Sequence, residues 1–299
     1  MTAEKRYLFV LGTGRCGSSL VQELIARHPD VGFLSNVDDR LSVLDLKGQW
    51  NSAIYQRIPP RLARKGRLRF APSEGYRALR RRVSPIICEP PRDLLAGDAS
   101  PWLTTRLRDF FDSRHAAQTK PVFVHKFTGW PRAGLLREVF PTARFVHIYR
   151  DGRAVANSLA QMPWWSGHRG PDQWRWGELA DDDRDAWQKS DRSWPVLAAI
   201  EWKMLMDALG EAEARVPEGQ WLSVKYEDLI TDPNHWLAQI LEFAGLSDNE
   251  TFWSHVRSNT LKVDRIDAYR QDLRPEEVQV VEQVLKDHLE VLGYRVGGS

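Results

Sequence analysis

YLFVLGTGRCGSSLVQELIARHP, residues 7–29, decides the fold of this chain. Residues 7–11 form a short apolar run with the composition of a buried strand. Gly12 and Gly14 follow, and they allow a tight turn in which the backbone can approach a ligand closely. A helix begins near Gly17, and its first N–H groups and its dipole favour an anion there. The stretch therefore predicts a phosphate-binding loop between a strand and a helix.

This loop differs from that of the P-loop NTPases in one residue type. Gly12 to Ser19 fits the spacing of the NTPase motif, but Ser18 stands where its lysine holds the terminal phosphates of ATP or GTP. The cation of this loop is Arg15 instead. A loop with one arginine, two hydroxyl groups and no lysine favours a phosphosulfate over a triphosphate. The plainer alternative is a tight turn that caps a helix, which Gly and Ser form routinely.

A second segment, RFVHIYRDGRAVANS at residues 144–158, has a similar organisation. An apolar strand ends at Arg150 and Asp151, and a helix follows. Ser158 lies about two turns along that helix, since a helix rises about 1.5 Å per residue. Arg150 and Ser158 together favour a site for one compact anion, such as a second phosphate. The alternative is a surface ion pair and an ordinary helical serine.

Together the two segments resemble the sulfotransferases that use 3′-phosphoadenosine 5′-phosphosulfate (PAPS). The family loop that binds the 5′-phosphosulfate is usually written R-x-G-[ST]-[ST], and here it reads Arg15, Cys16, Gly17, Ser18, Ser19. The family grips the 3′-phosphate by an arginine and a serine eight residues apart, which match Arg150 and Ser158. The run R-D-G-R is common in the tyrosylprotein-sulfotransferase-like and bacterial branches, which this chain resembles most.

Further matches follow in the family's order along the chain. PVFVHKFTGWP, residues 121–131, has a strand that ends in Lys126, and WLSVKYEDLITDP, residues 221–233, has Tyr226 near the nucleotide. RSNTLKVDRIDAYRQDLRP, residues 257–275, resembles a basic loop that folds over the nucleotide. The resemblance thus implies a donor site made of Gly14, Arg15, Cys16, Gly17, Ser18, Ser19, Arg150, Ser158, Tyr226, Lys262 and Arg270.

The chemistry implied by the resemblance is transfer of a sulfuryl group from PAPS to a hydroxyl or an amine. The product is adenosine 3′,5′-bisphosphate (PAP). Positioning and charge stabilisation supply most of the rate in such transfers, and Arg15 and Lys126 would hold the charge that develops on the leaving group. The scheme needs no metal.

A hydroxyl acceptor needs a general base, and here the chain departs from its relatives. The tyrosylprotein-like branch has a glutamate after the H-P-D-V stretch, where this chain has Asn36. We predict Asp39 as the base, ahead of Asp38 and His125. His125 is a candidate because cytosolic relatives use a histidine near the same strand end. The alternative for both aspartates is a loop or helix cap.

Composition sets bounds on function. The 299 residues are 42% hydrophobic, enough for one large domain, and the net charge of +2 gives no broad basic field for nucleic acid. No apolar run reaches membrane length and no signal peptide is evident. Two cysteines, Cys16 and Cys88, make no disulfide framework, so a reduced, cytoplasmic protein is expected. No cluster of Cys and His has zinc-site spacing, and we expect no metal.

The predicted fold class is α/β, with a three-layer architecture in which a mainly parallel central sheet has helices on both faces around the P-loop-like cradle. We predict one domain over residues 1–299, with acceptor or lid segments at about 36–120 and 161–200. The predicted strands are 7–12, 31–35, 121–126, 144–149 and 220–225. The predicted helices are 17–28, 131–139, 152–160, 191–214, 234–244 and 275–292, and residues 41–120 are expected to be irregular and partly helical.

Seven of the thirteen tryptophans fall within residues 164–202. One interpretation is an acceptor wall or lid, because aromatic faces stack on apolar or sugar-like molecules. The other is that these residues pack a helix against the sheet, which we favour for Trp194 and Trp202. Trp164 and Trp165, just after the predicted 3′-phosphate segment, are the candidates for acceptor binding.

The acceptor predicted from these features is a small molecule or a glycan that the sequence does not identify further. Two other functions stay open. One is a P-loop kinase or NTPase with Asp151 as a magnesium-binding carboxylate, against which the absent lysine counts. The other is a non-catalytic module that binds a nucleotide, against which Arg15, Lys126, Arg150 and Ser158 count.

Overall fold

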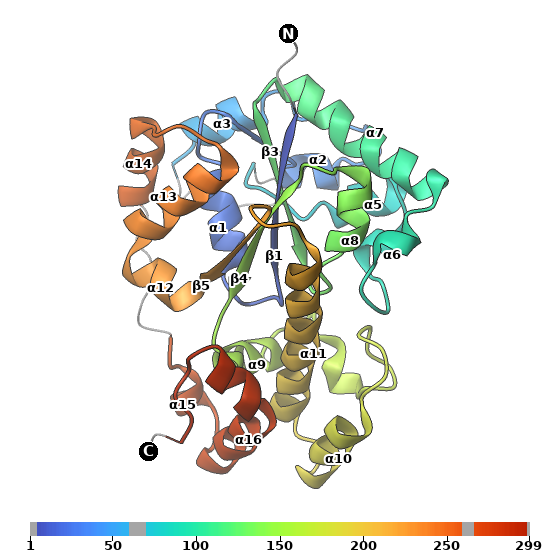
Figure 1. Cartoon of the computed structure of the whole chain (residues 1–299), viewed down its shortest axis with the longest axis vertical. Coiled ribbons are helices and arrows are strands. Elements are labelled where there is room, and N and C mark those ends of the chain that lie inside the picture. The colour runs from blue at the N-terminus through green and yellow to red at the C-terminus, as the bar shows by residue number, and fades with distance from the viewer. Residues whose placement is uncertain (1–4, 60–69, 259–265, 298–299) are drawn as a thin grey trace.

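A parallel sheet forms the centre of the computed structural model, which describes residues 5–59, 70–258 and 266–297 (Figure 1). Within these residues the strands lie in the order β2-β3-β1-β4-β5, and every neighbouring pair is parallel. The strands are β1 (Arg6–Gly12), β2 (Val31–Phe33), β3 (Val122–Thr128), β4 (Arg144–Tyr149) and β5 (Trp221–Lys225). The predicted α/β class with a mainly parallel sheet is confirmed.

The central strand β1 is apolar at successive positions because both of its faces are covered. Tyr7 and Phe9 pack into one apolar cluster, whereas Leu8 and Val10 pack into another on the opposite face. Side chains alternate between the two faces of a strand, so a parallel strand covered on both sides reads as a continuous apolar run. This is why residues 7–11 could be identified from sequence as a buried strand.

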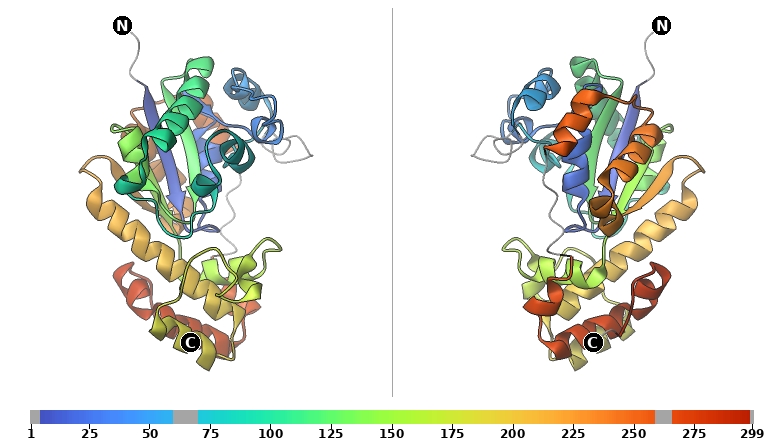
Figure 2. Two further views of the ribbon diagram at one scale, coloured as in Figure 1. Left: turned by 90° about the vertical axis from the view of Figure 1, so that its right-hand side faces the viewer. Right: turned by 90° about the vertical axis from the view of Figure 1, so that its left-hand side faces the viewer.

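Helices cover both faces of the sheet (Figures 1 and 2). Apolar side chains of one set of helices pack in the cluster that contains Leu8: α1 (Ser18–Ile25), α3 (Asn51–Arg57), α12 (Tyr226–Thr231), α13 (Pro233–Ala244) and α14 (Glu250–Arg257). The cluster that contains Phe9 is completed by α5 (Tyr76–Arg82), α6 (Pro85–Cys88), α7 (Pro101–Gln118), α8 (Ala133–Val139) and α11 (Trp194–Arg215). The three-layer arrangement agrees with the prediction.

A further group of helices lies beyond the carboxyl ends of the strands, in the lower part of Figures 1 and 2. It consists of α9 (Gly152–Ala160), α10 (Asp181–Lys189), α15 (Tyr269–Asp272) and α16 (Pro275–Val291). The long helix α11 connects this group to the sheet, since it packs against both α9 and α16. Ligands of parallel α/β sheets bind at the carboxyl ends of the strands, so this arrangement sets the position of the candidate site.

Most predicted elements are present, and residues 41–120 are partly helical as expected, although the individual helices were not predicted. That region contains α7, an 18-residue helix with Ser100 as its N-cap and Pro101 in its first turn. Both are signals for a helix start, so the sequence did carry this helix. Helix α1 is shorter than predicted, because the N–H groups of Arg27 and His28 bond to carbonyls three residues back and tighten the chain into a turn.

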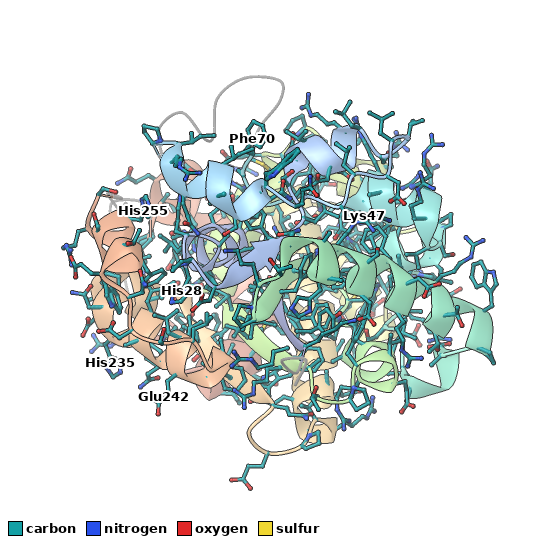
Figure 3. The ribbon with its side chains drawn as sticks, turned by 90° about the horizontal axis from the view of Figure 1, so that it is seen from above. His28, Lys47, Phe70, His235, Glu242 and His255 are labelled. Atoms are coloured by element: carbon teal, nitrogen blue, oxygen red, sulfur yellow. The ribbon has the colours of Figure 1, made fainter. Side chains whose placement is uncertain are left out.

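Figure 3 shows the molecule from above, on the edge where the strands begin, with α3, α7 and α13 around it. His28 lies at this edge, where its ring bonds to the carbonyl of Ser247 at 2.9 Å. Among the described helices, none is both long enough and apolar enough to cross a membrane. The short helix α2 (Asn36–Arg40) and the 3₁₀ turns η1 (Ala96–Asp98) and η2 (Ser166–Arg169) complete the described elements.

Candidate active site

The loop after β1 holds its backbone in the left-handed region at three of four consecutive residues. Gly14, Arg15 and Gly17 have φ angles of 90°, 54° and 98°. Such a loop turns successive N–H groups toward one point, and α1 follows with no side-chain cap on its first N–H groups. A Cβ atom at Gly17 would lie 2.2 Å from the ring of Tyr226, so the close approach of that ring also requires glycine. This backbone geometry suits an anion, and the binding of one by the loop stays a prediction.

The segment after β4 lies directly against this loop. The Nε of Arg15 donates a hydrogen bond to the Ser158 hydroxyl at 2.9 Å, and Arg150 donates from Nη1 to the Arg15 carbonyl at 3.3 Å. The Arg150 guanidinium also stacks over the Tyr226 ring at 4.9 Å. Burial, and then the positive charge of Arg150, lower the pKa of Arg15. Two guanidinium groups this close to one another favour an anion between them.

Lys126 lies on β3, two residues before the strand ends, and its ammonium group contacts Ser19 in the first turn of α1. Its Nζ is 2.6 Å from the Ser19 hydroxyl and 2.5 Å from a carboxylate oxygen of Glu74. Thr128 donates its hydroxyl to the same oxygen at 2.6 Å. Burial would raise the pKa of Glu74, but the Lys126 charge and the hydrogen bonds from Lys126, Thr128 and Tyr76 outweigh it and hold the pKa below its usual value. Glu74 is therefore an ionised carboxylate beside a lysine.

Sequence reasoning missed Glu74, because its position depends on a long-range contact. Residues 71–73 run beside the chain that follows β2, with an antiparallel bridge between Ser35 and Pro72. The N–H of Ser73 bonds to the carbonyl of Leu34 at 2.9 Å. This pairing places Glu74 beside the end of β3. No local sequence motif around Glu74 indicates that position.

These groups line one cavity of about 500 Å³ at the carboxyl ends of β1 and β3. Among the residues that the structure describes, its charged lining consists of one carboxylate, from Glu74, and four cations, from Arg15, Lys126, Arg150 and Arg175. A second cavity of about 390 Å³ continues past Arg15, Arg150 and Tyr226, which line both, to Ser158 and Tyr269. The two cavities together form an elongated, strongly cationic space suited to a ligand with more than one anionic group.

A family model for the sulfotransferase family matches residues 8–250 of the chain. The chain belongs to the sulfotransferase family. The match spans β1, the loop, Lys126, the Arg150–Ser158 segment and Tyr226. Among curated protein sequences, none matches this sulfotransferase significantly.

Solved structures support the same fold for this sulfotransferase. Sulfotransferase STF9 from Mycobacterium avium is 15% identical with a TM-score of 0.57, and the match covers 99% of this chain and 79% of that one. The sulfotransferase domain of an olefin synthase from Synechococcus PCC 7002 is 16% identical with a TM-score of 0.53, covering 99% and 98%. Sulfotransferase STF1 from Mycobacterium tuberculosis is 17% identical with a TM-score of 0.52, covering 96% and 78%. Identities this low show the fold alone.

Asp38 and Asp39, the two aspartates predicted as a general base, form hydrogen bonds at helix starts in this sulfotransferase. Asp39 Oδ1 accepts hydrogen bonds from the N–H groups of Arg77 and Ala78 at 2.8 and 3.0 Å, and so caps α5. Asp38 forms a capping box with Ser35 at the start of α2. Both side chains are buried and neither lines the cationic cavity. Both match the helix-cap alternative.

His125 points away from the cavity because it neighbours Lys126 on β3, and successive strand residues face opposite sides of the sheet. Its ring is fully buried, with its edge against Phe111 and Phe127 at 5.0 and 4.7 Å. Burial lowers the pKa of His125 to about 3, so the ring is neutral. The geometry therefore does not suit His125 as the base.

The two tryptophans predicted to bind the acceptor differ in environment. Trp164 is 56% exposed and lines the cationic cavity. Trp165 is 3% exposed, and its indole N–H donates to Glu201 at 2.7 Å, so it packs in the core beside the cavity. Trp202 is buried in the main apolar cluster, as favoured from sequence, whereas Trp194 is 56% exposed.

Some of the remaining donor-site candidates line a cavity, and others are buried or lie outside the described residues. Ser18 lines the cavity, and Cys16 is fully buried beneath the loop in the apolar cluster with Leu8. Arg270 lies on α15 next to Tyr269, whose ring lines the second cavity. Lys262 lies outside the described residues. No group of three His, Cys, Asp or Glu side chains suited to a metal occurs in the described part of the chain.

Proposed function

We propose that the protein transfers a sulfuryl group from PAPS to a hydroxyl of a small-molecule or glycan acceptor and releases PAP. The observation that carries this proposal is the four-cation cavity behind a P-loop-like turn in which Ser18 replaces the NTPase lysine. The residues present fit such a donor, because the cations lie on both sides of the loop and suit two separate phosphate groups. PAPS supplies the sulfuryl group and carries away the leaving oxygen as part of the 5′-phosphate.

Each side chain then has a distinct task. The loop N–H groups, Ser18 and Ser19 donate hydrogen bonds to the 5′-phosphate, as helix N-termini do in other phosphate sites. Arg150 and Ser158 bind the 3′-phosphate. Tyr226, which packs on Gly17 and under Arg150, borders the nucleotide where the two cavities meet.

Glu74 replaces Asp39 as the proposed general base. It is the carboxylate of the cavity, and it lies 2.5 Å from the lysine that faces the leaving group. It takes the proton of the acceptor hydroxyl as the acceptor oxygen bonds to sulfur and the bond from sulfur to the bridging oxygen breaks. The protonated Glu74 no longer neutralises Lys126, so the full charge of the ammonium becomes available to the new phosphate oxygen.

Lys126 can serve both partners without a change of position. An ammonium group has three N–H donors, and the Ser19 hydroxyl and Glu74 take two of them. The third N–H can donate to the bridging oxygen of the donor. Arg15 supports the same charge from the opposite side of the loop.

A thermal-shift titration of the whole protein tests the proposal, with PAP compared against ATP plus magnesium. A ligand at about 100 times its Kd adds about 2.7 kcal/mol of stability, which raises Tm by about 5 °C in a chain of this size. We expect this shift with PAP and little with ATP. A shift with ATP and magnesium alone would favour a kinase or NTPase, and PAP binding without turnover across acceptors would favour a non-catalytic module.

A further inference from the structure

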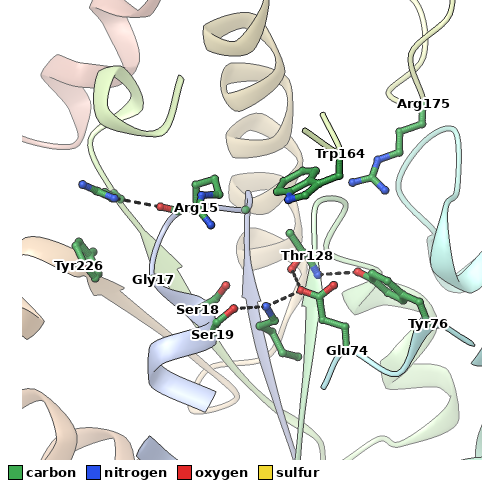
Figure 4. Close-up of a pocket in the computed structure, with 13 residues that line it drawn as sticks. Arg15, Gly17, Ser18, Ser19, Glu74, Tyr76, Thr128, Trp164, Arg175 and Tyr226 are labelled. Atoms are coloured by element: carbon green, nitrogen blue, oxygen red, sulfur yellow. Dashed lines mark hydrogen bonds and ion pairs between the residues drawn. The ribbon is translucent and has the colours of Figure 1, made fainter. Parts of the chain in front are cut away.

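Arg175 is the cation of the site that the proposed donor chemistry does not use. It lines the same cavity as Glu74 and Tyr76, on the side away from Tyr226 (Figure 4). Burial and then the charge of Glu74 raise the pKa of Tyr76, and the charge of Arg175 opposes this rise by a smaller amount. The two phosphates of the proposed donor lie instead beside Arg15 and Arg150. Arg175 is thus at the end of the cavity where an acceptor must enter.

The Arg175 guanidinium is held by an aromatic ring. It lies over Trp176 at 4.4 Å, and no carboxylate of the described chain lies within ion-pair distance of it. Trp176 is itself fixed: it is buried, packs edge-on against Trp130, and lies against Gly129, where a Cβ atom would approach it to 2.6 Å. Stacking leaves the N–H edge of a guanidinium available, and that edge matches the two oxygens of a carboxylate.

Trp164 adds an aromatic surface beside this cation. Its side chain is 56% exposed although it lines the cavity, and Figure 4 shows its ring next to Arg175 and across from Glu74. A large exposed aromatic side chain in a pocket favours a flat ring as its partner. A ring on Trp164 would lie between the cation and the proposed base.

Resting on the proposed function, we propose that the acceptor is a hydroxylated ring compound that carries an anionic group, such as a carboxylate or a sulfate ester. The ring lies on Trp164, the anionic group binds Arg175, and the hydroxyl faces Glu74. Arg175 is then the residue that selects acidic acceptors over neutral ones of the same shape. A site with a partly buried cation binds the neutral analogue less tightly, because the cation is then left without an anionic partner.

The test measures binding of matched acid and amide probes to the protein saturated with PAP. Each hydroxyphenyl carboxylic acid is paired with its neutral amide, and each sulfate monoester with its neutral alcohol. Calorimetry measures the Kd of every probe. We expect at least one acid to bind about 10-fold more tightly than its neutral partner, which corresponds to about 1.4 kcal/mol. Arg175→Gln should reduce this ratio to about one and leave the Kd of PAP unchanged, whereas Arg175→Lys should keep part of it.

Arg184→Gln is the matched control. Arg184 is a nearby arginine that pairs with Asp172 at 3.4 Å and lies outside the cationic cavity, so the acid preference should persist. Equal binding of acids and neutral partners to the wild type, or a preference retained by Arg175→Gln, would overturn the assignment. So would a weaker Kd for PAP in Arg175→Gln with the ratio unchanged, because Arg175 would then serve the donor. Loss of PAP binding by the wild type itself would instead contradict the proposed function.

Discussion

The two ends of the cationic cavity are built differently. At the donor end, Arg15 and Arg150 belong to segments that leave neighbouring strands, β1 and β4, and hydrogen bonds tie these segments together. At the acceptor end, Glu74, Trp164 and Arg175 come from loops and turns between helices. The donor end is thus fixed by the sheet, and the acceptor end by side-chain packing. Loops on a fixed scaffold are where specificity can vary with least effect on the fold.

The largest expected effect is a loss of kcat, without a loss of donor affinity, on substitution of Glu74 at the acceptor end. Glu74→Gln removes the proposed base but keeps the size of the side chain, so kcat should fall by about 10²- to 10⁴-fold while the Kd of PAP changes little. Lys126 holds the pKa of Glu74 below its usual value, so wild-type kcat should stay constant as pH falls from 8 to about 5. Steady-state kinetics with a hydroxyl acceptor over this pH range measures both.

Asp39→Asn is the control for this prediction. Its Oδ1 atom can still cap α5, so kcat should stay within a few-fold of the wild-type value. A large loss of kcat in Asp39→Asn with an intact melting curve, and none in Glu74→Gln, would return the base to Asp39.

The second prediction concerns the pH dependence of folding stability that Glu201, beneath the acceptor end, should cause. Glu201 is buried and accepts a hydrogen bond from Trp165, and burial raises its pKa to about 7. The folded state therefore holds this proton more tightly than the unfolded state, and stability falls as pH rises from about 4.5 to about 7, by about 3 kcal/mol in total. Glu201→Gln should be more stable than wild type by about 2–3 kcal/mol at pH 8, and the gain should vanish near pH 4.5.

Urea unfolding at the two pH values measures this difference. Glu218→Gln, which alters an exposed carboxylate, should leave stability unchanged at both. Equal stability of wild type and Glu201→Gln at pH 8 would mean that Glu201 ionises without cost, and the packing beneath Trp165 would need another explanation.

The smallest predicted effect is at the donor end. Ser158→Ala removes a hydroxyl that Arg15 contacts, and we expect the Kd of PAP to rise by about 3- to 10-fold, the value of one hydrogen bond of about 0.5–1.5 kcal/mol. The value of kcat at saturating donor should be unchanged. Calorimetry with PAP measures the change in Kd. Ser254→Ala, which alters an exposed serine on α14, is the control. A lower kcat with unaltered PAP affinity would place Ser158 in the acceptor end instead.

The donor end could be predicted from sequence because its signals are local. The strand, the glycines and the helix start lie within residues 7–29, and Arg150 and Ser158 lie on one strand-to-helix connection. At the acceptor end Trp164 was a candidate from sequence, whereas Glu74 was not, because the long-range bridge between Ser35 and Pro72 brings it there. His125 could have been weighed differently from sequence, because once Lys126 is assigned to the cavity, alternation along β3 places its neighbour on the opposite face of the sheet.

The distribution of positive charge also has a kinetic consequence. Arg15 and Arg150 contact positions that we assign to phosphates, and PAPS and PAP have these phosphates in common. The spent nucleotide should therefore compete with fresh donor for the same site. Under the proposed function, sustained turnover then depends on an activity that removes PAP, and the ratio of the two nucleotides sets the rate more than the concentration of either.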